Sequence, residues 1–189
     1  LSLIDMTPVS SHHVLASFID QCTNLNELTL QNCHLPSLKP SKSITKIILR
    51  HSTTSKWIVG MKKLKKLQIF GQMDLSDEEL FDYDVLQTFT ELEELEIYSS
   101  EIKNSLQIPN VQRLKLHQVT RLPTNLIASE TKIVHLDVSN CDECTEQILQ
   151  EAALKMRKLQ RISVSHGRAS HATIVDLKRR CRELKNFFT

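Results

Sequence analysis

The 189-residue sequence has little glycine, few aromatic residues and no long apolar run. Its three glycines, Gly60, Gly71 and Gly167, are not spaced as a phosphate-binding loop requires. Because no stretch of about 18 apolar residues occurs, and no basic segment precedes an apolar one at the start, neither a membrane-spanning helix nor a signal peptide is predicted. One tryptophan, two tyrosines and six phenylalanines leave the core to Leu, Ile and Val.

Neither sign of charge dominates, since 24 Lys and Arg residues against 22 Asp and Glu residues give a formal charge of +2. This balance argues against nucleic acid or an anionic membrane as the main partner. The five cysteines are odd in number and sparse, and no Asn-x-Ser/Thr glycosylation site occurs. Both features argue against a secreted disulfide framework and predict a protein of the cytosol or nucleus.

The usual catalytic signatures are missing as well. The sequence has no nucleophile elbow of the G-x-S-x-G type, no G-x-x-x-x-G-K-S/T loop, no G-x-G-x-x-G and no H-E-x-x-H. We therefore expect a protein that is not an enzyme and that carries no cofactor.

A metal site is also not predicted. Cys141 and Cys144 have the two-residue spacing of half a zinc site, but no second Cys or His pair completes it. We interpret both as structural cysteines of a tight turn between a strand and a helix. The paired histidines at 12–13, and those at 166 and 171, are interpreted as solvated.

What the chain does have is an internal repeat of three apolar positions with the spacing L-x-x-L-x-L. Seven full copies begin 19 to 28 residues apart, with these members: Leu25, Leu28, Leu30; Ile44, Ile47, Leu49; Leu64, Leu67, Ile69; Leu92, Leu95, Ile97; Val111, Leu114, Leu116; Ile133, Leu136, Val138; and Leu159, Ile162, Val164. Leu1 and Leu3 fit an earlier partial copy, and Leu184 and Phe187 fit a later one. Such a repeat predicts stacked units that share one continuous core.

The last two apolar positions of each copy predict a strand with one buried face. In x-L-x-L-x the two apolar side chains point to one side and the three flanking residues point to the other. One strand cannot bury its apolar face alone, so successive copies are expected to pair as a parallel sheet, returning through convex segments. Helical returns are predicted at Ser11–Asp20, from a capping box at Ser76–Glu79 through Phe89, from Thr145 to Met156, and at Ser170–Glu183.

The pattern resembles the leucine-rich repeat family over essentially the whole chain. The runs Cys22-Thr23-Asn24-Leu25 to Asn32-Cys33, and Val138-Ser139-Asn140-Cys141 before a helix, are similar to the cysteine-containing subtype common in F-box leucine-rich-repeat proteins. The other copies depart from it, because their strand-end cysteine position holds Ser52, Gln72, Ser100, Val119 or Gly167. The resemblance implies an α/β solenoid over residues 1–189, with a concave parallel sheet, convex helices and loops, and about eight to nine irregular repeats.

The outward residues of the sheet are the candidate binding site. Aligning the copies places Arg50, Phe70, Tyr98 and His117 at one position of successive strands. Aromatic and Arg side chains dominate the energetics of many interfaces, so these four are predicted to anchor a partner segment. An aromatic pair that only stabilises neighbouring strands is the alternative. The remaining candidates occupy the two other outward positions: Lys46, Lys66, Gln68, Glu96, Arg113 and Lys115. Lys46 and Lys66 beside Arg50 suggest an acidic or phosphorylated peptide.

By this resemblance, the chain is expected to be the substrate-recognition region of an F-box-type ubiquitin-ligase receptor. Because Leu1 already lies inside a copy, we also expect a fragment of a longer chain, whose upstream part would bind a ubiquitin-ligase adaptor. Two alternatives are the ligand-sensing or autoinhibitory repeats of an intracellular immune receptor, and a GTPase-activating leucine-rich-repeat protein using Arg50. An upstream nucleotide-binding domain would distinguish the first alternative.

Overall fold

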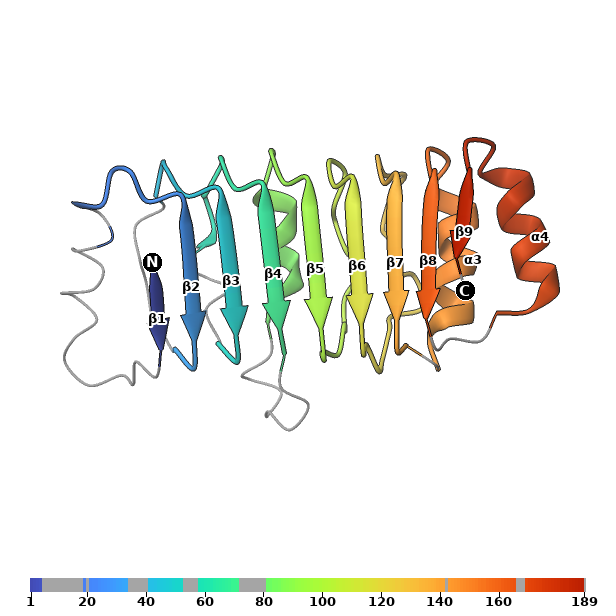
Figure 1. Cartoon of the computed structure of the whole chain (residues 1–189), viewed down its shortest axis with the longest axis horizontal. Helices are drawn as coiled ribbons and strands as arrows, with labels where there is room; N and C mark the ends of the chain where they lie inside the picture. The colour runs from blue at the N-terminus through green and yellow to red at the C-terminus, as the bar shows by residue number, and fades with distance from the viewer. Residues whose placement is uncertain are drawn as a thin grey trace.

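The computed structural model describes residues 1–4, 19, 21–33, 41–52, 58–71, 81–141, 143–165 and 169–188. Within them, a single parallel sheet follows the order of the chain, each strand pairing with the next (Figure 1). Its strands are β1 (Ser2–Ile4), β2 (Glu27–Gln31), β3 (Lys46–Arg50), β4 (Lys66–Phe70), β5 (Glu94–Tyr98), β6 (Arg113–His117), β7 (His135–Ser139), β8 (Arg161–Ser165) and β9 (Asn186–Phe188). This α/β arrangement is compatible with a solenoid, because every return segment brings the chain back to the same edge.

The predicted strand register is confirmed. In each strand from β2 to β8 the second and fourth residues are buried and the flanking residues are half-buried or exposed. Equivalent positions pair across the sheet, for example Leu28 with Ile47 and Phe70 with Tyr98. The later partial copy also fits, since Phe187 pairs with Ile162.

The helices lie on the face of the sheet that carries the buried side chains. They are the 3-10 helix η2 (Tyr83–Thr88) and the α-helices α3 (Thr145–Lys155) and α4 (His171–Arg180). Figure 1 shows η2 behind β4 and β5, and α3 behind the last strands. No described helix is long and apolar enough to cross a membrane.

Two helix predictions require correction. Residues 72–80, which include the predicted capping box, lie outside the described residues, and the helix that follows is 3-10, capped by the Asp82 carboxylate, which accepts from the Asp84 N–H at 3.0 Å. Helix α4 begins after Ser170 as predicted but ends at Arg180, before Glu183. It ends early because Leu184 must turn into the next strand, and its N–H donates to the Cys181 carbonyl at 3.0 Å. Apart from Ile19, the predicted helix at 11–20 also lies outside the described residues.

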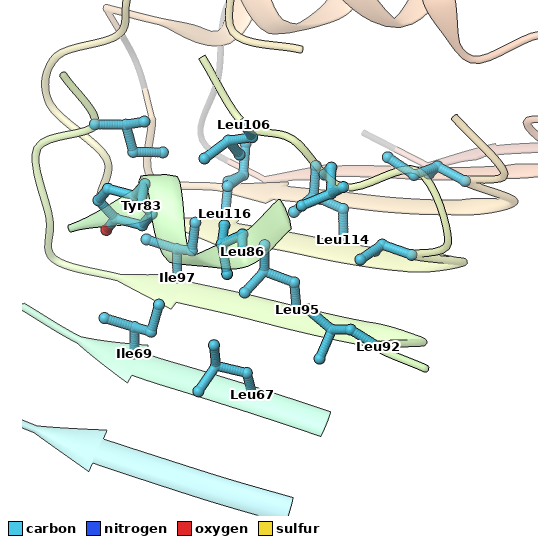
Figure 2. Close-up of a cluster of buried hydrophobic side chains, with 14 of the residues drawn as sticks. Leu67, Ile69, Tyr83, Leu86, Leu92, Leu95, Ile97, Leu106, Leu114 and Leu116 are labelled. Carbon is cyan, nitrogen blue, oxygen red and sulfur yellow. The ribbon is translucent and has the colours of Figure 1, made fainter. Parts of the chain in front are cut away.

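The core is an aliphatic ladder between the sheet and its return segments. Figure 2 shows Tyr83 and Leu86 of η2 lying over Leu95, Ile97 and Leu116 of the sheet, and all five side chains are buried. Burial of each aliphatic side chain contributes about 1.5–3 kcal/mol, so the ladder is the main source of stability.

A repeated turn closes each strand on the side of the cysteine position. The residue after the strand has a positive φ in five copies, at Asn32, His51, Ser99, Gln118 and Asn140. In three of these copies the next side chain turns back to a carbonyl of its own strand: Cys33 Sγ to Gln31 O at 3.1 Å, Ser52 Oγ to Arg50 O at 2.9 Å and Cys141 Sγ to Ser139 O at 3.4 Å. Serine can therefore replace cysteine here, because its hydroxyl makes the same contact. After Gln118 the position holds the buried apolar side chain of Val119 instead.

Candidate protein-binding surface

The outward residues of β2 to β8 form a face that we call the open face. At its centre lies the aromatic column, which consists of Arg50, Phe70, Tyr98 and His117 on four adjacent strands. The Phe70 and Tyr98 rings are parallel within 3°, with centroids 4.3 Å apart. The Arg50 guanidinium lies 4.1 Å from the Phe70 centroid, and the His117 ring is tilted by 45° at 5.6 Å from Tyr98.

The parallel register explains this stack. Neighbouring parallel strands are about 4.8 Å apart, which is close to the stacking distance of two aromatic rings. Since the Phe70 and Tyr98 backbones pair directly, their rings come together when both side chains lean the same way. The sequence prediction that these four residues share one column is confirmed by the strand pairing.

The Glu96 carboxylate fixes Tyr98, the third residue of the column. It accepts hydrogen bonds from the Tyr98 hydroxyl and Gln68 Nε2, both at 2.6 Å, and lies 2.6 Å from Lys66 Nζ. Burial would raise the pKa of Glu96, but the bonds from Lys66, Tyr98 and Gln68 outweigh burial and hold that pKa below its ordinary value. Burial, together with the bond to Glu96, raises the pKa of Tyr98, which therefore remains a neutral donor.

The charged candidates are paired with one another or with residues that the prediction omitted. Lys46 lies 2.8 Å from Glu27, and Lys66 lies 3.0 Å from Glu94. Arg113 also pairs with Glu94. Lys115 is 3.8 Å from Asp137 and its ammonium lies 5.5 Å from the Tyr98 centroid. The ammonium groups expected to attract an acidic peptide are thus already balanced within the sheet.

His117 is the last residue of the column. Its Nε2 lies 3.1 Å from Asn140 Nδ2, while its Nδ1 is shielded from solvent and has no hydrogen-bond partner among the residues that the structure describes. Burial and then the nearby Lys115 charge lower the pKa of His117. The ring is therefore neutral near pH 7.

A groove of about 280 Å³ continues the open face across β5 to β8. Three candidates line it, Glu96, Arg113 and Lys115, together with residues that the prediction missed, among them His135, Asp137, Arg161 and Ser163. These residues occupy the same outward positions as the candidates, so the strand register could have identified them. The prediction passed over them because these strands carry no outward aromatic residue.

The buried cysteines do not form a ligand set. Cys141 Sγ lies 3.7 Å from Leu116 O, and Cys144 Sγ lies 3.4 Å from Thr120 O. Burial raises the pKa of both thiols, which favours the protonated form over a metal-binding thiolate. Within the described ranges, no group of three or more His, Cys, Asp or Glu side chains is placed to hold a metal ion.

These contacts make the open face a surface of fixed, mutually supporting side chains. No model of a known protein family matches the sequence, and no curated protein matches it.

Proposed function

We propose that this chain is a protein-binding module of the leucine-rich-repeat type, and that its open face holds a segment of a partner protein. The observation that carries the proposal is the aromatic column, whose two stacked rings lie half-buried on the side of the sheet opposite the helices. A rigid aromatic pair offers contact area at a small cost in conformational entropy, which is typical of interface anchors.

The surroundings of the column support a protein ligand. The Glu96 carboxylate and the Gln68 amide lie next to the Tyr98 hydroxyl. Apolar anchors beside polar groups that fix orientation are the usual composition of an interface centre and its rim. The paired lysines favour aromatic anchoring over attraction of an acidic peptide.

The proposal has a narrower form, in which the module recognises substrates for an F-box-type ubiquitin-ligase receptor in the cytosol or nucleus. It rests on the resemblance of the cysteine-containing copies. It is tested by co-purification of the full-length protein with a ubiquitin-ligase adaptor. An adaptor that binds stoichiometrically supports the receptor role, whereas its absence would remove that role and leave the binding module.

The binding site itself is tested by photo-crosslinking. A benzoylphenylalanine introduced at Gln68, beside the column, should crosslink a partner in cells, whereas the same group at the exposed α4 position Val175 should not give that product. Equal crosslinking from both positions would contradict the assignment.

A further inference from the structure

The charge of this chain is very unevenly distributed. Residues 155–189 contain ten Lys and Arg residues but only two acidic ones, although the whole chain has 24 against 22. The remaining residues therefore carry a net negative charge, so the small net charge of the whole chain conceals the positive charge of residues 155–189.

Much of this positive charge gathers where α3 and α4 end. The two helix ends lie side by side, because Cys181 Sγ after α4 is 3.4 Å from the Met156 carbonyl after α3. Arg157 follows α3, Arg179 and Arg180 end α4, and Arg182 lies in the turn beyond. All four side chains are exposed.

These four arginines line a groove of about 510 Å³ with Ala153 and Leu154, which we call the arginine groove. Leu154 is 51% exposed, which is unusual for a leucine on a helix that buries its neighbours Ala152 and Ala153. A second depression of about 370 Å³ shares Ala153 and Leu154 and extends to Ala172 and Thr173. The surface between α3 and α4 thus carries small side chains beside Leu154 at one end and arginines at the other.

Local contacts account for only part of the positive charge. Arg179 and Arg180 share Asp176, at 2.5 and 2.7 Å, and Arg157 lies 3.2 Å from Glu130. Helix dipoles also favour cations at helix C-termini. Among the described residues, however, Arg182 has no ion-pair partner, and neither explanation requires an exposed Leu154.

We infer that the arginine groove binds an acidic peptide that carries an apolar anchor. The anchor would pack on Leu154, Ala153 and Ala172, and neighbouring Asp or Glu side chains would meet Arg157 and Arg182. Arginine suits this role because its guanidinium can donate two parallel hydrogen bonds to one carboxylate. The site is separate from the open face, so the module has two surfaces for protein.

A peptide fits the groove better than nucleic acid. No aromatic side chain lines either depression, so bases would have no stacking platform. Glu183 and Asp176 also line the two depressions. Their carboxylates would repel a backbone with a charge on every nucleotide more than a peptide whose apolar residues can lie beside them.

The test is fluorescence anisotropy with a labelled peptide of sequence Glu-Asp-Leu-Glu-Asp-Leu-Leu-Glu and its Gln/Asn counterpart. We expect saturable, salt-sensitive binding of the acidic peptide only. The pair Arg157→Glu and Arg182→Glu should weaken binding by about tenfold or more, and Leu154→Ser by several-fold. The pair Lys62→Glu and Lys63→Glu makes the same charge change at exposed residues before β4 and should leave binding unchanged.

Circular dichroism and thermal unfolding establish that every variant is folded, and Phe70→Ala with Tyr98→Ala should bind the peptide normally. The inference is overturned if the acidic peptide does not saturate, or if the lysine pair weakens binding as much as the arginine pair. It is also overturned if duplex DNA or phosphatidylserine vesicles bind more tightly than the peptide and are lost with the same arginine pair.

Discussion

Phe70 and Tyr98 stack with their rings parallel within 3° and their centroids 4.3 Å apart. The stack is held at both ends, by the Arg50 guanidinium over Phe70 and by the Glu96 carboxylate, which accepts from the Tyr98 hydroxyl at 2.6 Å. The column is thus pre-organised before any partner arrives, which lowers the entropy cost of binding.

The ion pairs beside the column predict a dependence of stability on pH. Burial raises the pKa values of Glu94 and Glu96, but Lys66 and other donors hold both below their ordinary value of 4.5. A carboxylate whose pKa is lower in the folded state than in the unfolded state stabilises the fold at pH values above its unfolded-state pKa. This stabilisation is lost as the pH falls through the folded-state pKa. Lys66→Met should therefore lower the free energy of unfolding near pH 7 by about 1 kcal/mol, and the difference should shrink as the pH falls below 4.5 through the lower folded-state pKa values.

Urea unfolding at several pH values measures this effect. A loss that stays constant from neutral to acid pH would show that the Lys66 side chain contributes through packing and not through charge.

The buried hydrogen bond between Tyr83 and Ser100 predicts a non-additive pair of substitutions. Their hydroxyl oxygens lie 2.8 Å apart, and both side chains are buried. Ser100→Ala leaves the buried Tyr83 hydroxyl without its partner, and Tyr83→Phe leaves the Ser100 hydroxyl only the longer contact to the Glu101 carbonyl at 3.4 Å. Each change should cost about 1–3 kcal/mol. The double variant removes both hydroxyls, so it should cost about 1 kcal/mol less than the sum of the two single changes. Strict additivity in chemical denaturation would show that the two hydroxyls do not depend on each other.

The thiols should differ sharply in reactivity. Cys33, Cys141, Cys144 and Cys181 are buried, whereas Cys22 is half-buried. Burial raises the pKa of Cys141, Cys144 and Cys181, so little thiolate is present near pH 7. In the native protein, iodoacetamide should label Cys22 first and the other four about a thousandfold more slowly, because they require unfolding.

Mass spectrometry of timed samples locates the labels, and urea-unfolded protein provides the control in which all five react. Rapid labelling of Cys141 in the native protein would contradict its place in the closed turn.

The sheet could be predicted from sequence because burial acts on it with a simple period. Alternation of Leu67, Gln68 and Ile69, repeated in seven copies, leaves one register in which every apolar side chain is buried. That register also predicted the aromatic column.

The helices and the ion pairs were harder to predict, because they depend on contacts between copies. The cap at Asp82 determines where η2 begins, and the end of α4 follows from the turn at Leu184. Glu94 was passed over although it lies between Lys66 and Arg113 in register. A search for alternating charge along the outward columns would have found it.

The most direct test of the open face as a binding surface is quantitative affinity purification from native lysate. Folded wild-type protein is compared with Phe70→Ala plus Tyr98→Ala, and with a control pair, Gln31→Ala plus Ser165→Ala. The control residues occupy the equivalent outward position of β2 and β8, beyond the aromatic column. We predict that wild type and the control pair retain the same partner. The purified binding segment of that partner should bind the aromatic double variant at least about 30-fold more weakly than it binds wild type. If every partner survives loss of both rings with unchanged affinity, the aromatic column only stabilises the sheet and the open face is not the recognition surface.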